Sequence, residues 1–215
     1  MKYIKSGVLS VITGFLMVLP VNAGNPSENL PPEWEHMAKG GEVISPEEAA
    51  QNEWEIADIK VLRLSPSEFP QLPIKIKKEL VKRQCLIPQT FISTQPHNVI
   101  QGQFQRKGQE DWAVLCSTGR VSSILIFWGG ASKQVASTAS SPDINSLQGI
   151  DDRKIGYSRE ISVVGRKYIL EYLRHHGGPT PPPITHDGIE NSFIDKFSTV
   201  FYYYKGNWVP LTGAD

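Results

Sequence analysis

The stretch from Asn98 to Trp128, NVIQGQFQRKGQEDWAVLCSTGRVSSILIFW, decides the fold. It contains three short apolar runs, separated by two polar breaks that each hold a glycine: Val99–Phe104, Trp112–Cys116 and Ser123–Trp128. Runs of this length, rich in Val, Ile, Phe and Trp, are typical of β-strands and too short for helices. The stretch therefore predicts an antiparallel β-meander on which the rest of the chain packs.

Helices are predicted in three segments outside the meander. Ser45 followed by Pro46 and two glutamates is typical of a helix start, and it predicts a short helix from Pro46 to about Asn52. Pro73–Gln84 and Arg166–His176 carry apolar residues at helical spacing, and Gly177 follows the second segment where a helix C-cap belongs.

The remaining segments are predicted to be strand or loop. Part of Glu53–Leu64 is expected to be strand, and Ser198–Leu211 to be a C-terminal hairpin that turns at Lys205–Asn207. The interval Gly129–Arg153 is expected to be a long surface loop with one helical turn near Ile144–Leu147. These elements together predict an α+β fold: a β-meander and a C-terminal hairpin with two or three packed helices.

The first 23 residues have the layout of a secretory signal peptide. Lys2 and Lys5 give a basic start, residues 7–19 are apolar, and Val21-Asn22-Ala23 forms a small-residue cleavage site before Gly24. The apolar segment is shorter than the roughly 20 residues that a membrane anchor needs. The sequence thus predicts export to the periplasm or the exterior, an extended or disordered lead-in over residues 24–44, and one domain over residues 45–215.

Charge narrows the range of partners. Basic and acidic residues number 22 each in the whole chain, and the signal peptide contains two of the lysines. A nearly neutral mature protein argues against nucleic acid or an anionic membrane surface as the main partner. We expect no membrane span after cleavage and no cofactor.

Cys85 and Cys116 are the only cysteines. In an oxidising compartment an even count favours a disulfide, which would tie the helix that ends near Gln84 to the second strand of the meander. The alternative is a pair of separate buried thiols. Bridged cysteines would place their Cα atoms roughly 4.4–6.8 Å apart.

Four stretches carry a resemblance to known proteins: CLIPQ at Cys85–Gln89, GQEDWAVLCS at Gly108–Ser117, HHGGPTPPPITHDGIE at His175–Glu190 and the closing KGNWVPLTGAD. With them the chain resembles a group of uncharacterised exported bacterial proteins, which implies a common fold and export but no activity. The segment GQF…KGQEDWAVL also resembles one hairpin of FG-GAP or VCBS propeller repeats. That implies a strand–loop–strand unit, whereas the loop lacks the first acidic residues of the calcium-binding loop in those repeats.

Two groups of residues are candidate sites. His175, His176, His186, Asp187 and Glu190 are of the types that bind divalent metals or act as acid and base, and His186, Asp187, Glu190 and His175 are the catalytic candidates. Against this, two histidines at a helix end and an Asp-Gly turn also have ordinary structural roles.

The second group, Asp111, Trp112, Arg120 and Trp128, could bind a peptide or carbohydrate ligand. The alternative is that the aspartate organises its own loop and the tryptophans belong to the core. No nucleophile-elbow, P-loop or HExxH motif occurs in the chain.

Two functional hypotheses follow. The first is a non-catalytic exported protein that binds a protein, peptide or carbohydrate partner at the cell envelope. The alternative is a metal-dependent hydrolase that uses His186, Asp187 and Glu190.

Overall fold

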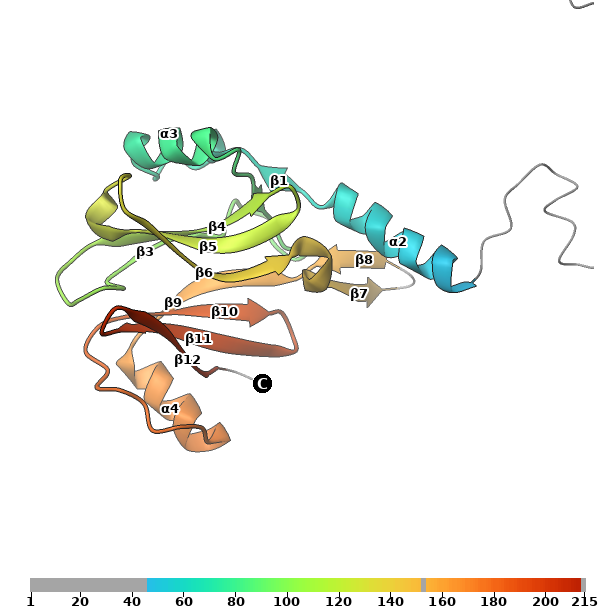
Figure 1. Ribbon diagram of the computed structural model, residues 1–215. Coiled ribbons are helices and arrows are strands. Elements are labelled where there is room, and N and C mark those ends of the chain that lie inside the picture. The colour runs from blue at the N-terminus through green and yellow to red at the C-terminus, as the bar shows by residue number, and fades with distance from the viewer. Residues whose placement is uncertain (1–45, 152–153, 214–215) are drawn as a thin grey trace, which may run out of the picture. The chain divides into compact units, whose positions relative to one another are not determined.

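The computed structural model describes residues 46–151 and 154–213, and Figure 1 shows their arrangement. Antiparallel sheets and three α-helices make up this part of the chain, so the predicted α+β class is confirmed. The predicted signal peptide and lead-in, residues 1–44, lie outside the described residues. No helix in the described ranges has the length and apolar character needed to cross a bilayer.

The first sheet is the predicted meander, extended by one strand. Its strands lie in chain order: β3 (Val99–Gly102), β4 (Asp111–Thr118), β5 (Val121–Phe127) and β6 (Val135–Pro142). Ala113 pairs with Ile126 and Leu115 with Ile124. Because β4 is covered on both faces, it is an almost unbroken apolar run rather than an alternating one.

The interval Gly129–Arg153 was predicted to be a long loop, and that prediction is wrong. It begins within η3 (Trp128–Gly130) and contains β6, η4 (Asp143–Ser146) and β7 (Leu147–Asp151). The sequence of β6, VASTASSP, lacks the apolar residues of a typical strand because β6 lies at the edge of its sheet and is mostly half-exposed. Pairing with β5 stabilises it instead. The expected helical turn near Ile144 is confirmed as η4.

The second sheet is also a four-stranded meander: β9 (Arg159–Val164), β10 (Gly188–Phe193), β11 (Phe197–Tyr204) and β12 (Asn207–Thr212). β11 and β12 are the predicted C-terminal hairpin. Their two-residue turn has positive φ at both Lys205 (48°) and Gly206 (87°), as tight hairpins with right-handed twist require. The prediction is confirmed.

Apolar side chains fill the space between the two sheets. Ala113, Leu115, Ile124 and Ile126 from the first sheet pack in one cluster with Ile161 and Ile189 from the second. The helices α3 (Ile74–Lys82) and α4 (Arg166–His176), both predicted, cover the outer faces. Ile76 and Leu80 of α3 pack on Val114, and Ile169 of α4 packs on Val200 and Tyr202. The order of layers is therefore helix, sheet, sheet, helix (Figure 1).

The other elements are the helix α2 (Pro46–Lys60), the turn η2 (Pro66–Glu68) and two short sheets, β1 (Arg63–Leu64) with β2 (Ile87–Pro88) and β7 with β8 (Lys154–Tyr157). Glu53–Leu64 was predicted to be partly strand, but residues 53–60 are helical and only β1 is strand. The reason is that Trp54, Ala57 and Val61 recur at helical spacing and pack together against the core.

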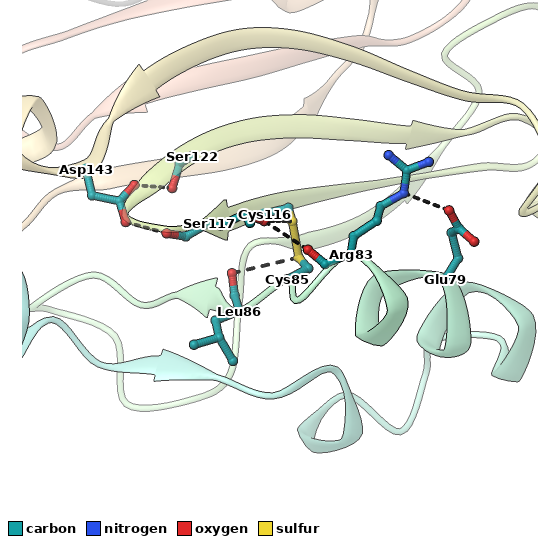
Figure 2. Close-up of a disulfide and its surroundings, with 9 residues drawn as sticks. Glu79, Arg83, Cys85, Leu86, Cys116, Ser117, Ser122 and Asp143 are labelled. Carbon is teal, nitrogen blue, oxygen red and sulfur yellow. Dashed lines mark hydrogen bonds and ion pairs between the residues drawn. A yellow bond between two sulfur atoms is a disulfide. The ribbon is translucent and has the colours of Figure 1, made fainter. Parts of the chain in front are cut away.

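The predicted disulfide between Cys85 and Cys116 is confirmed, with a Cα–Cα distance of 5.4 Å. Figure 2 shows it between the segment that leaves α3 and strand β4. Its two neighbours strengthen the connection, because Leu86 and Ser117 exchange backbone hydrogen bonds of 3.0 and 2.8 Å. The bridge thus fixes the end of α3 to the sheet that the helix covers.

Candidate functional site

The histidine and carboxylate candidates do not converge. His175 lies in the last turn of α4 with Nε2 at 3.1 Å from Nη2 of Arg174, and His176 stacks on Tyr172. His186 stacks on the ring of Tyr202, with the centroids 4.3 Å apart. In residues 46–151 and 154–213, no three His, Cys, Asp or Glu side chains lie close enough together to hold a metal ion.

Asp187 and Glu190 each have a local structural role. A carboxylate oxygen of Asp187 accepts the backbone N–H of Gln103 at 2.9 Å, which joins β10 to the loop after β3. Glu190 is buried, and its carboxylate accepts hydrogen bonds from Tyr168, from Ser162 at 3.1 Å and from Ser198 at 2.7 Å.

Glu190 also changes the acidity of its neighbour on α4. Burial and the hydrogen bond to this carboxylate together raise the pKa of Tyr168. The phenol therefore stays protonated and continues to donate to Glu190. This arrangement fastens α4 to the second sheet and leaves no position for a substrate between the two groups.

The second set of candidates is divided between two ends of the first sheet. Asp111 is fully buried and accepts hydrogen bonds from the backbone N–H groups of Phe104 and Gln105, both at 2.9 Å, and of Gly129 at 2.7 Å. It thus organises the loop between β3 and β4. Arg120 lies in the turn after β4, at the opposite end of the strand, where it pairs with Asp58 at 3.2 Å.

The tryptophans of this set belong to different clusters. Trp112 is buried in the core beneath α3. Trp128 is half-buried on the other side of the first sheet, where it stacks on Trp208 at a centroid distance of 5.8 Å and meets Tyr203 at 4.9 Å. Asp111, Trp112, Arg120 and Trp128 therefore do not line one common site.

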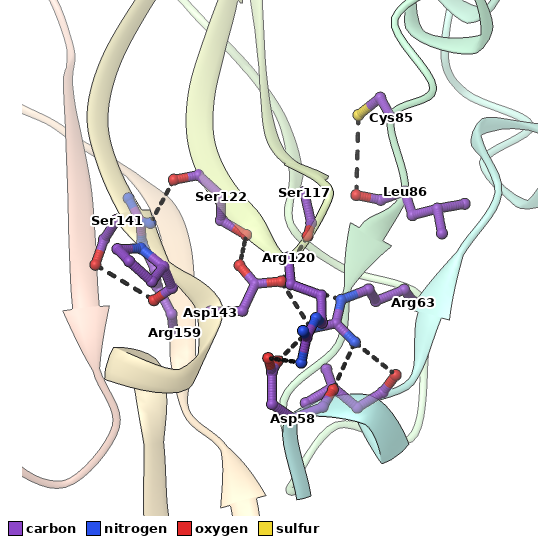
Figure 3. Close-up of polar contacts among 12 residues, drawn as sticks. Asp58, Arg63, Cys85, Leu86, Ser117, Arg120, Ser122, Ser141, Asp143 and Arg159 are labelled. Carbon is purple, nitrogen blue, oxygen red and sulfur yellow. Dashed lines mark hydrogen bonds and ion pairs between the residues drawn. The ribbon is translucent and has the colours of Figure 1, made fainter. Parts of the chain in front are cut away.

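Sequence reasoning missed a buried network of charged side chains, drawn in Figure 3. Arg63 donates to Asp58 at 2.6 Å and to Asp143 at 2.8 Å. The fully buried Asp143 also accepts hydrogen bonds from the hydroxyls of Ser117, at 2.5 Å, and Ser122. Each carboxylate oxygen has a donor, so the network joins α2, β1, β4, β5 and η4 as a structural unit.

A groove between α2, the loop 89–93 and β8 has a volume of about 690 Å³. Ligand-binding clefts commonly have volumes of roughly 300–1,000 Å³. Its polar lining residues include Glu53, Lys60 and Lys154. Most of the lining is apolar: Ile56, Ala57, Val61, Leu62, Phe91, Ile150, Ile155, Gly156 and Tyr157.

Large apolar side chains remain exposed at this groove. Ile56 is 42% exposed, Leu62 61% and Phe91 37%, and their sequence neighbours Ile59 and Ile92 are exposed as well. Apolar side chains that gather at one hollow are typical of a binding surface, whereas single exposed ones are not.

Among the described residues, strand β8 leaves the backbone groups of one residue, Ile155, unpaired on its side away from β7. The carbonyl of Tyr157 accepts the N–H of Phe91 at 2.9 Å on the side of β8 away from β7. The N–H of the next residue, Ser158, points the opposite way and donates to the carbonyl of Ser146, which precedes β7. Because alternate residues of a strand direct their backbone groups to the same side, Ile155 faces the same way as Tyr157. In the described ranges no backbone partner of Ile155 lies on that side.

One glycine shapes the groove. A Cβ on Gly156 would lie 2.7 Å from Cβ of Phe91 and 2.9 Å from its Cγ. A side chain at position 156 would therefore displace Phe91, and only glycine lets this ring lie against the strand.

His97 holds the loop that carries Phe91. Its Nε2 accepts the backbone N–H of Thr90 at 3.1 Å, so the ring proton must lie on Nδ1, which faces the carbonyl of Gln95 at 3.3 Å. Burial lowers the pKa of His97 more than the Gln95 carbonyl and the charge of Glu160 raise it. The histidine is thus neutral at neutral pH and keeps its acceptor for the loop.

Comparison of the chain with protein-family models, curated proteins and solved structures found no match in any of the three. A functional conclusion therefore depends on the geometry of this chain alone.

Proposed function

We propose that this chain is an exported, non-catalytic binding protein of the cell envelope, and that its groove between α2 and β8 binds an extended apolar peptide segment of a protein partner. The observation that carries the proposal is the combination, in one groove, of exposed apolar side chains with the unpaired backbone groups of Ile155 in β8. Export is supported by the signal-peptide pattern of residues 1–23 and by the disulfide.

A peptide fits the groove better than the other partner classes. An added strand would satisfy the backbone groups of Ile155, and its side chains would alternate between the apolar base and solvent. A carbohydrate usually stacks on exposed aromatic rings, and Phe91 is the one aromatic side chain in the groove with large exposure, since Tyr157 is 3% exposed. A metal-dependent hydrolase lacks support, because the described residues contain no metal-binding group.

The test uses a fluorescein-labelled nonapeptide of alternating valine and serine, with binding followed by fluorescence anisotropy. Leu62→Ser removes an apolar side chain of the groove, and Val81→Ser is its matched control on α3, since the two side chains are 61% and 62% exposed. We expect Leu62→Ser to weaken binding about tenfold, which corresponds to the roughly 1.4 kcal/mol gained by burying much of a leucine side chain. Val81→Ser should leave binding unchanged.

A second peptide tests the strand edge directly. Methylation of alternate backbone nitrogens removes donors while it leaves the side chains in place, so one of the two alternating methylation patterns should abolish binding. Equal binding by wild type and Leu62→Ser, or equal binding of both methylated peptides and the parent, would overturn the proposal. Binding of an oligosaccharide but not of the peptide would also overturn it.

A further inference from the structure

A further arginine, Arg159 of β9, contacts the charged network through the carbonyl of Ser122 but donates no hydrogen bond to a carboxylate of the described residues. Arg63 and Arg120 pair with aspartates, whereas the guanidinium of Arg159 donates only to neutral acceptors. These acceptors are Oδ1 of Asn191 at 2.7 Å, the carbonyl of Ser122 at 3.1 Å and the carbonyl of Ala139 at 2.5 Å. In residues 46–151 and 154–213, Arg159 forms no ion pair. Figure 3 shows it beside Ser141, apart from Arg63 and Arg120.

A charge in this position is costly. Arg159 is 5% exposed. A guanidinium has about five N–H donors, and three hydrogen bonds to acceptors are present, so some donors remain unused. Burial lowers the pKa of Arg159 more than the charges of Tyr157 and Asp143 raise it, and a guanidinium still carries its charge at neutral pH. The carboxylate of Asp143 acts on this charge but is already paired with Arg63, so the three guanidinium groups of Arg63, Arg120 and Arg159 share the two carboxylates of Asp58 and Asp143. A bound anion would supply the further negative charge.

Arg159 lines a hollow of about 250 Å³ at the edges of the two sheets. Its walls contain hydroxyl and amide side chains, which can donate hydrogen bonds, and no acidic residue: Ser140, Ser141, Asn145, Ser146, Asn191 and Ser192. Phe193 and Phe197 form the remaining wall.

We propose that this hollow binds a small oxyanion, either a carboxylate or a tetrahedral anion such as sulfate, with Arg159 as its counter-charge. The guanidinium of Arg159 would form charge-assisted hydrogen bonds to the anion. The serine and asparagine side chains would donate the remaining hydrogen bonds that the anion accepts. The site is separate from the groove beside α2 and does not depend on peptide binding there.

The test is a nuclear magnetic resonance titration of the full mature protein with sodium acetate and, separately, with sodium sulfate. Ionic strength is held constant with sodium chloride, and the side-chain Nε–H signal of Arg159 is followed together with the backbone amides of Ser141 and Asn145. We expect a saturable shift of these signals with at least one of the two anions. The anion that saturates at the lower concentration distinguishes a carboxylate ligand from a tetrahedral one.

Two substitutions complete the test. Arg159→Met should abolish the saturable shifts, whereas Arg174→Met, which removes an exposed arginine at the end of α4, should preserve them. If Arg159→Met does not fold, Asn145→Leu at the exposed rim should weaken saturation at least threefold. Wild-type signals that do not saturate with either anion overturn the proposal, and so does saturation that survives Arg159→Met.

Discussion

Arg63 and Asp143, eighty residues apart in the chain, form a two-pronged ion pair in which Nε and Nη2 approach the same carboxylate oxygen at 3.0 and 2.8 Å. Arg63 belongs to β1 and Asp143 to η4, so the pair connects the segment after α2 with the end of the first sheet. Both side chains are largely withdrawn from solvent, with exposures of 10% and 0%. Loss of Asp143 would leave Arg63 with Asp58, at 2.6 Å, as its carboxylate partner in the network, so the charge of Arg63 would be only partly compensated.

Asp143→Asn should therefore lower the free energy of unfolding by about 2–3 kcal/mol, at or below the lower end of the roughly 3–5 kcal/mol range for breaking a buried ion pair, because Asp58 still pairs with Arg63. Urea denaturation followed by tryptophan fluorescence measures it. Glu79→Gln is the control, because it breaks the solvent-exposed pair of Glu79 with Arg83 on α3. That change should cost less than about 1 kcal/mol. Similar decreases in the free energy of unfolding in both variants would show that the Arg63–Asp143 pair contributes no more to stability than the exposed pair.

The disulfide should contribute about 2–5 kcal/mol to stability, because it restricts the unfolded chain between Cys85 and Cys116. The double substitution Cys85→Ala and Cys116→Ala, compared with wild type under oxidising conditions, is expected to lower the melting temperature. Thiol counting of the folded wild type should find no free thiol. Under reducing conditions the difference in melting temperature between the two proteins should become smaller. An unchanged difference would contradict the view that the disulfide bond causes it.

The layers of this fold could be predicted where the signal is local. The apolar runs of β4 and β5, the helical spacing of Arg166–His176 and the turn at Lys205 each lie within about a dozen neighbouring residues, and all three predictions are confirmed. β6 was missed because its serines and alanines carry no such pattern and its pairing with β5 is a tertiary contact.

The polar residues with structural roles were less predictable. Asp111 was predicted as either a ligand-binding residue or an organiser of its loop, and its hydrogen bonds place it in that loop. Nothing around Asp143 in the sequence distinguishes it from other polar loop residues, because its partners come from β1, β4 and β5. The groove likewise combines Leu62, Phe91 and Ile155 from three separate segments.

Tyr157 should titrate late and make stability fall in strong alkali. Burial raises its pKa to about 12 from the model-peptide value of 10.0, although the nearby hydroxyls of Ser122 and Ser146 lower it in part. Among the described residues, its hydroxyl has no partner in hydrogen-bonding geometry. Between these two pH values the unfolded state loses the phenolic proton first. It then binds fewer protons than the folded state, so the free energy of unfolding decreases as pH rises from 10 to 12.

Tyr157→Phe checks this directly. In an absorbance titration of phenolate formation, the variant should lack one of the late-titrating tyrosines and should lose less stability in alkali than wild type. At neutral pH it should be at least as stable as wild type, because the substitution removes a buried hydroxyl without a partner. A marked loss of stability at pH 7 would show that the hydroxyl has a partner after all.

His97 should make the loop beside the groove sensitive to acid. Its folded-state pKa lies below the model value of 6.5, because burial disfavours the imidazolium and Nε2 must stay unprotonated to accept the N–H of Thr90. Below pH 6.5 the unfolded state therefore binds more protons than the folded one, and the stability that His97 contributes is lost as pH falls through its folded pKa.

Urea denaturation of wild type and His97→Gln at pH 7 and pH 5 measures the effect. The difference in free energy of unfolding between wild type and His97→Gln should be smaller at pH 5 than at pH 7. The control His175→Gln, at the exposed end of α4, should not show this decrease. A constant difference between wild type and His97→Gln would mean that the Thr90 contact survives protonation, and the loop that carries Phe91 would then keep its position in acid.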